Sequence, residues 1–150
     1  MPQSLSKLYV HLVFSTKGRR DLIPPAHMED VHAYLAAVLE AHGCHVLAIG
    51  GTSNHVHILM DMARVRSLAE LVRLVKSNSS RWLCELAGGK DSFGWQAGYA
   101  AFSISKSHVG AVCAYISDQQ RHHEVVAYDD EFRRLCKIYD MAIDERYAWD

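Results

Sequence analysis

Along the chain, segments with the apolar pattern of a strand alternate with segments that have the apolar repeat of a helix. The run LYVHLVFS at residues 8–15 is rich in β-branched and aromatic residues and predicts a first strand. Two more apolar runs, at residues 44–49 and from His55 to Met62, predict a hairpin whose turn contains Gly50 and Gly51. Between these strands, an apolar repeat at i, i+3, i+4, i+7 and i+8 predicts an amphipathic helix, ended by Gly43, with the positions Val31, Tyr34, Leu35, Val38 and Leu39.

The second half of the chain continues with a helix, a strand and another helix. Ser67 and Glu70 have the spacing of a capping box, in which each side chain accepts a backbone donor at the start of a helix. Residues 98–105 predict a fourth strand, Ser107 is the expected cap of a third helix, and an amphipathic tail of mixed charge follows from Glu131. The helix that begins at Ser67 ends at Gly88 and Gly89, and its core stripe is Leu68, Leu71, Val72, Val75, Trp82, Leu83 and Leu86.

The predicted order β-α-β-β-α-β, followed by a helix, is that of a ferredoxin-like split βαβ sandwich in the α+β class. We expect an antiparallel sheet with helices on one face and a catalytic helix near the C-terminus. No repeat or low-complexity linker interrupts residues 1–150, which favours a single domain. Because this architecture serves many functions, the fold alone does not name one.

Composition narrows the class of protein. Of the 150 residues 49% are hydrophobic and 22% charged, which is typical of a globular domain with a proper core. The formal net charge of −1 means that bulk charge alone does not recruit a polyanion, so a nucleic-acid surface must be a local patch. The apolar runs are too short to span a bilayer and no signal peptide is expected, which favours a cytoplasmic protein without a membrane partner. The four cysteines form no C-x-x-C pair and are expected to be reduced and buried.

Two of the ten histidines, His55 and His57, alternate along a predicted strand. The period of two directs both imidazoles to the same face of the sheet, where they supply half of a divalent-metal site. Taken alone, an H-x-H triplet fits equally well with two imidazoles that are satisfied by neighbouring polar groups. Of the other histidines, only His122 is a candidate, as a residue that supports the site from outside the ligand set.

Tyr115 and Gln119 lie at i and i+4 on one flank of the third predicted helix. A phenolic oxygen is a competent nucleophile on phosphorus when a cation holds the phosphate, and the amide oxygen of Gln119 can be the third ligand of that cation. Without the histidine pair, Tyr115 is better explained as a rim tyrosine with a hydrated hydroxyl.

Positive charge is concentrated in two segments. Five basic residues and one acid lie between Met62 and Leu83, and a second basic cluster follows the first strand. Such patches bind phosphates through screened attraction and counterion release, although basic residues on exposed helix faces are commonplace. The candidate DNA contacts are Lys17, Arg19, Arg20, Arg73, Lys76 and Arg81.

The ordered set of motifs resembles the insertion-sequence-200/605-type transposases, which are single-tyrosine members of the HUH endonuclease superfamily. The resemblance covers nearly the whole chain, and its specific part is the combination of H-x-H with a downstream Y-x-x-x-Q. The segments that carry it are YVHLVFSTKGRR, GGTSNHVHILMDM, ELVRLVKSNSSRWL, WQAGYAAFSIS, YISDQQRHH and DERYAWD.

The resemblance implies that His55, His57 and Gln119 hold one Mg²⁺ or Mn²⁺ and that Tyr115 is the nucleophile. It further implies cleavage and rejoining of single-stranded DNA at hairpin-bearing element ends through a 5′-phosphotyrosyl intermediate, with no organic cofactor. A homodimer is expected, in which the H-x-H of one subunit and the tyrosine helix of the other complete each site.

Three alternatives remain open. One is a domesticated relative that processes repeat hairpins elsewhere in the chromosome and no longer moves its own gene. Another is a non-catalytic nucleic-acid-binding module on the same sandwich, which would use aromatic residues on an open sheet face. The last is a metal-dependent hydrolase with a water nucleophile, for which Asp61 is the carboxylate nearest to the histidine pair along the chain.

Overall fold

The computed structural model describes residues 2–89 and 91–150. Its centre is a four-stranded sheet in the order β2-β3-β1-β4, and β1 pairs antiparallel with both β3 and β4, as β2 does with β3. The strands are β1 (Tyr9–Ser15), β2 (His45–Thr52), β3 (His55–Asp61) and β4 (Ala100–Ser103). This is the sheet of the α+β sandwich that the sequence predicts.

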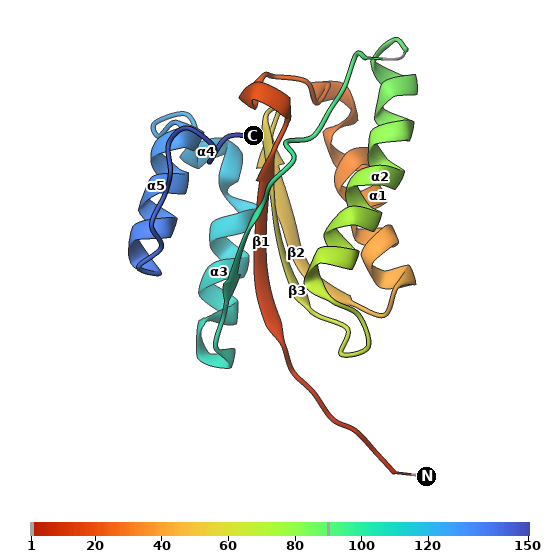
Figure 1. Ribbon diagram of the computed structural model, residues 1–150, viewed down its shortest axis with the longest axis vertical. Helices are drawn as coiled ribbons and strands as arrows, with labels where there is room; N and C mark the ends of the chain where they lie inside the picture. Colours follow the sequence, from red (N-terminus) through yellow and green to blue (C-terminus); the bar gives the residue numbers. More distant parts are fainter. Residues whose placement is uncertain (1, 90) are drawn as a thin grey trace.

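Helices cover both faces of the sheet. Figure 1 shows α1 and α2 on one face and α3, α4 and α5 on the other, with β1 seen nearly edge-on between them. The bounds are α1 (Met28–Ala41), α2 (Leu68–Ala87), α3 (Val109–Ser117), α4 (Gln119–His122) and α5 (Tyr128–Ile138). Among the described residues, none of the helices combines the length and the hydrophobicity that a bilayer crossing requires.

The alternation of side chains along the strands divides the interior into two layers. Leu12 and Phe14 of β1 and Val56 and Ile58 of β3 are buried against α1 and α2, in the larger core. Val13, on the other face of β1, packs in a smaller cluster with Phe102 and the inward side of α5. His55 and His57 point to this second layer, as the period of two predicts, and they are fully buried there.

The helix ends show which of the predicted capping residues cap a helix in the structure. The hydroxyl of Ser67 accepts a hydrogen bond from the Glu70 amide at 3.1 Å, and Gly88 ends α2 with a φ of 111°, as predicted. The reciprocal half of the capping box is not made, because the Glu70 carboxylate accepts a bond from Arg66 instead. The prediction for Ser107 is wrong: it lies in a 3-10 turn, and α3 starts after His108 without a side-chain cap.

Three further expectations change in detail. Gly50 and Gly51 lie within β2 and not in the hairpin turn, which is formed by the residues between β2 and β3. The tail helix begins at Tyr128, three residues before the predicted start. The fourth strand is shorter than residues 98–105, since only four of these residues are strand. All four cysteines are free; Cys44 and Cys136 are buried as expected, whereas Cys84 and Cys113 are only partly buried.

Candidate active site

The H-x-H motif lies at the centre of the second layer. His55 and His57 come from the start of β3, where they pair across the sheet with Ser15 and Val13 of β1. His11, on the same face of β1, places its Nε2 2.8 Å from Nδ1 of His57 and fixes the orientation of that ring. The Nδ1 of His55 is likewise held, 2.8 Å from Oδ1 of Asn54. Both imidazoles therefore direct Nε2 away from the strand, toward α3 to α5.

Tyr115 and Gln119 reach these histidines from the same chain. Tyr115 is on α3, and Gln119 opens α4 after a break at Asp118, so the continuous helix that their i, i+4 spacing suggests is interrupted. The Gln119 Oε1 lies 3.0 Å from Nε2 of His55. The resemblance implies a site shared between two subunits, but here the helices that carry Tyr115 and Gln119 reach the H-x-H motif of the same chain.

A carboxylate that the sequence analysis did not select, Glu131 of α5, lies in the middle of the site. One of its oxygens is 2.7 Å from Nε2 of His57, and the other accepts hydrogen bonds from the Tyr115 hydroxyl and, at 3.2 Å, from the Gln119 amide. His122 and His123 contact the same carboxylate at 3.2 and 3.1 Å. His122, a predicted supporting residue, is therefore at the site, and so is His123, to which no role was assigned.

The electrostatics of the site follow from its burial. Burial is the main cause that lowers the pKa of His55 to about 3, and burial, together with the neighbouring His57, does the same for His11. Burial would raise the pKa of Glu131, but hydrogen bonds from His123, His57 and Tyr115 outweigh it and leave the pKa well below its ordinary value. Burial and the hydrogen bond to Glu131 raise the pKa of Tyr115. The site thus holds neutral imidazoles at His11 and His55, an ionised Glu131 carboxylate and a protonated Tyr115 phenol.

The hydrogen-bonding pattern fits a bound cation. Nδ1 of His55 lies 2.8 Å from Oδ1 of Asn54 and 3.1 Å from the Thr52 hydroxyl, and its Nε2 faces Oε1 of Gln119. The nitrogens of His123 face the Val126 carbonyl and, at 2.9 Å, Oε1 of Gln119. Nitrogen and oxygen atoms thus converge on one point, and the donor atoms of His55, His57, His123 and Glu131 lie within 4.8 Å of one another. Nitrogen and oxygen donors in this arrangement suit a divalent cation of the Mg²⁺ and Mn²⁺ type.

A cavity of about 270 Å³ between α3 and α5 gives access to Tyr115. His55 and His57 are fully buried, whereas Tyr115 is only partly buried and lines this cavity with Arg134, His11 and Glu131. A phosphate that enters here meets the phenol and a guanidinium. Asp61, by contrast, lies at the other end of β3, where it accepts bonds from Lys7 and the Leu8 amide. The carboxylate of this site is Glu131 and not Asp61.

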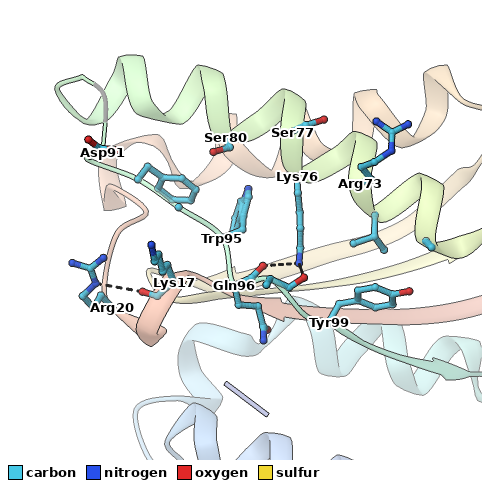
Figure 2. A pocket seen from close by; sticks show the side chains of 15 residues that line it. Lys17, Arg20, Arg73, Lys76, Ser77, Ser80, Asp91, Trp95, Gln96 and Tyr99 are labelled. Atoms are coloured by element: carbon cyan, nitrogen blue, oxygen red, sulfur yellow. Dashed lines mark hydrogen bonds between the residues drawn. The ribbon is translucent and has the colours of Figure 1, made fainter. Parts of the chain in front are cut away.

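Four of the six predicted DNA contacts line one groove, and the other two lie outside it. Lys17, Arg20, Arg73 and Lys76 line a groove of about 640 Å³ between α2 and the segment 91–99, which we call the α2 groove (Figure 2). Burial lowers the pKa of Lys76 to about 8, and its ammonium donates to the carbonyls of Gln96 and Gly98 at 2.8 and 2.5 Å. Arg19 instead forms an ion pair with Asp129 of α5, and Arg81 is exposed outside the groove.

Gly50 determines how closely α3 approaches the sheet. A Cβ at this position would lie 2.2 Å from the carbonyl oxygen of Ile116, the residue after Tyr115. We therefore expect Gly50→Ala to displace α3, to slow any reaction of Tyr115 by about 100-fold and to cost about 1–3 kcal/mol of stability.

Gly110→Ala is the matched control, because a Cβ there meets nothing within 4 Å. On α3 it should leave the reaction unchanged and stabilise the helix by roughly 0.5–1 kcal/mol. Urea unfolding and single-turnover kinetics measure both effects. Equal rates for the two alanine variants would show that the contact between α3 and Gly50 does not position Tyr115.

Comparison with known proteins gives one family and one fold. The model of the family described as "Transposase IS200 like" matches residues 4–119. Nothing among the curated proteins matches the chain. A putative transposase from Deinococcus radiodurans R1 superimposes with a TM-score of 0.62 at 19% identity, covering 79% of this chain and 98% of that one. The structure of a REP-associated tyrosine transposase bound to a REP hairpin has a TM-score of 0.62 at 14% identity, covering 84% of this chain and 74% of the other.

Proposed function

This chain belongs to the IS200-like transposase family, and we propose that it cleaves and rejoins single-stranded DNA through a covalent bond to Tyr115. The observation that carries the proposal is the convergence, within one chain, of Tyr115, His55, His57 and Gln119 around a single carboxylate. A hydroxyl beside a cluster of nitrogen and oxygen atoms that can bind a divalent cation is the arrangement that metal-assisted nucleophilic attack on a phosphate requires.

In this proposal, three residues bind the metal ion and one residue attacks the phosphate. His55, His57 and Gln119 are the proposed ligands of Mg²⁺ or Mn²⁺, which when bound polarises the scissile phosphate. The Tyr115 oxygen loses its proton as it attacks phosphorus, and the new bond links the phenol oxygen to the 5′-phosphate. The bond to the 3′-oxygen breaks, and this oxygen takes up a proton to leave a 3′-hydroxyl. Because the phosphotyrosyl bond conserves the energy of the phosphodiester, attack by a 3′-hydroxyl reverses the reaction without another energy source.

The path of the DNA is the second part of the proposal. The α2 groove lies on the face of α1 and α2, opposite to Tyr115, and the turn after β1 that supplies Lys17 and Arg20 to it also supplies Arg19 to α5. One solved neighbour holds a REP hairpin, which makes a DNA hairpin the first ligand to test. We propose that the hairpin lies in the α2 groove and that its single-stranded flank passes the sheet edge to reach Tyr115.

A homodimer, which the resemblance implies, is compatible with this proposal but is not required for the chemistry. One chain supplies the histidine pair, the amide and the tyrosine. We therefore propose assembly of the site in cis, whatever the oligomeric state.

A denaturing gel tests the function. The full chain is incubated with single-stranded DNA from the flanks of its own gene, labelled at the 3′ end, with Mn²⁺ or with chelator. We expect a labelled band at the mass of the protein plus DNA that appears only with the metal. Cleavage without such a band would support a water-using nuclease, and binding without cleavage would support a non-catalytic module.

The contribution of the groove is tested by Lys17→Ala, Arg20→Ala and Arg73→Ala. We expect each variant to weaken hairpin binding at all sequences alike and to reduce the slope of log K against log salt by about 1, because each loses a phosphate contact. Fluorescence anisotropy over a salt series measures this slope.

Arg146→Ala is the control for the groove variants, since Arg146 is exposed and paired with Asp144 outside the groove. Its salt slope should equal that of the wild type. Groove variants that bind like this control would place the DNA elsewhere on the molecule.

A further inference from the structure

Glu131 occupies a position that the H-x-H and Y-x-x-x-Q motifs do not explain. The family match ends at Gln119, whereas Glu131 lies on α5, beyond it. Its side chain is 2% exposed, and a carboxylate is seldom buried to this extent unless it is paired or binds a metal. Its surroundings show what it is paired with.

The helix α5 is built to hold this carboxylate in place. Tyr128, Phe132 and Cys136, one helical turn apart, pack on the sheet, and Glu131 is on the same inward side. The ring of Tyr128 stacks on His55 with centroids 4.4 Å apart, so α5 also fixes the face of a proposed metal ligand. Arg19 holds the first turn of α5 through Asp129. The position of Glu131 is thus fixed by contacts of the α5 residues that precede and follow it in the sequence.

The two oxygens of Glu131 face different groups. Oε1 lies 2.7 Å from Nε2 of His57 and 3.6 Å from Nε2 of His55, which are the atoms that H-x-H motifs offer to a metal. Neighbouring donor atoms around an ion with bonds of about 2.1 Å are about 3 Å apart, which is similar to these separations. Oε2 accepts the hydrogen bond from the Tyr115 hydroxyl. One carboxylate therefore joins the proposed metal ligands to the proposed nucleophile.

Given the proposed function, on which this inference rests, we propose that Glu131 is a further ligand of the divalent cation and the positioning residue of Tyr115. Its Oε1 completes the donor set begun by His55 and His57, and its Oε2 holds the phenol next to the bound phosphate. A carboxylate adds a negative charge that the imidazoles and the amide lack, so it contributes directly to the affinity for Mg²⁺ or Mn²⁺. The C-terminal helix α5 is then part of the active site.

Mn²⁺ binding tests the first half of the proposal without any DNA. Isothermal titration calorimetry or Mn²⁺ EPR on the full chain compares the wild type with Glu131→Gln and Glu131→Asp. We expect Glu131→Gln to weaken Mn²⁺ binding at least about 10–100-fold. Glu131→Asp keeps the charge on a shorter side chain, so its Mn²⁺ affinity should lie between those of the wild type and Glu131→Gln.

The neighbouring Asp130→Asn is the control, because it makes the same carboxylate-to-amide change at an exposed position of α5. It should bind Mn²⁺ with the affinity of the wild type, because its carboxylate pairs with Arg133 on the exposed side of α5. Circular dichroism confirms that each variant is folded; should Glu131→Gln unfold, Glu131→Asp carries the comparison. Equal Mn²⁺ affinity of the wild type and the Glu131 variants, or no binding by the wild type, overturns the ligand role.

The second half is tested by adduct formation at saturating Mn²⁺ and DNA. With the metal restored by mass action, Glu131→Gln should still form the Tyr115 adduct about tenfold more slowly, with unchanged DNA affinity, because a neutral amide holds the phenol less firmly than a carboxylate does. Full recovery of the rate would overturn the positioning role. If the wild type binds Mn²⁺ through Glu131 but forms no adduct on any strand, the proposed function fails while the metal site stands.

Discussion

Tyr115→Phe is expected to abolish the covalent adduct while leaving the fold and DNA binding intact. The substitution removes one oxygen, the only atom that can form the phosphotyrosyl bond, so we expect a loss of at least about 1000-fold that reaches the detection limit. The ring remains, with its edge contacts to His57 and His122 at centroid distances of 5.7 and 5.5 Å.

The carboxylate next to Tyr115 is not orphaned by this change. The second oxygen of Glu131 keeps His122, His123 and the Gln119 amide within 3.2 Å, so the loss of one donor should cost only about 0.5–1.5 kcal/mol. Urea unfolding measures this cost, and anisotropy with a labelled hairpin measures DNA binding.

Tyr147→Phe is the matched control, because this tyrosine is exposed in the C-terminal tail. It should form the adduct at the rate of the wild type. An adduct formed by Tyr115→Phe would mean that another residue is the nucleophile, and cleavage by this variant without an adduct would indicate attack by water.

Local sequence signals predicted the elements well where a few neighbouring residues decide the structure. The alternation in HVHILMDM placed His55 and His57 on one face, because every second side chain of a strand points the same way. The cap at Ser67 and the glycine stop at Gly88 also depend on the nearest turn alone. Ser107 lacks an acidic residue three positions later, where Gly110 stands, and it lies in a 3-10 turn that precedes α3, so the cap is not formed.

The parts of the site that escaped sequence reasoning depend on contacts between distant segments. Glu131 lies 74 residues from His57 along the chain, and only the packing of α5 on β1 and β4 brings them together. His11 looks like any strand histidine until the pairing of β1 with β3 places it beside His57. Gly50 was expected in a turn, because a glycine signals both turns and close backbone approach, and sequence alone does not distinguish the two.

The roles of the basic residues also depend on contacts that the sequence does not show. Composition identified a positive patch, but it did not separate the cations that face the α2 groove from those used inside the protein. Lys76 lines the groove together with Lys17 and Arg20, but its ammonium donates to backbone carbonyls, and Arg19 is paired with Asp129 of α5. A basic residue in the sequence therefore indicates a phosphate contact only if its side chain has no partner within the protein.

The metal-free protein should lose stability steeply between pH 6.5 and 5. Above pH 6.5 His11 and His55 are neutral in both the folded and the unfolded chain, and they contribute nothing to the pH dependence. Below it, the unfolded histidines take up protons, whereas burial keeps the folded ones neutral down to a pKa of about 3. Each then lowers the free energy of unfolding by about 1.4 kcal/mol per pH unit, or about 4 kcal/mol for both at pH 5.

Urea unfolding in chelator at pH 7, 6 and 5 measures this loss, which is a large part of a typical domain stability of about 5–15 kcal/mol. Glu131 does not contribute in this window, because its ordinary pKa of 4.5 lies below it. His11→Gln removes one of the two titrating groups and should halve the slope, while the same change at the exposed His45 should leave it unchanged. A stability that is equal at pH 7 and pH 5 would mean that these histidines take up protons as readily in the folded chain as in the unfolded chain. Mn²⁺ should oppose the loss, because it binds only the neutral imidazoles and so stabilises the state that acid disfavours.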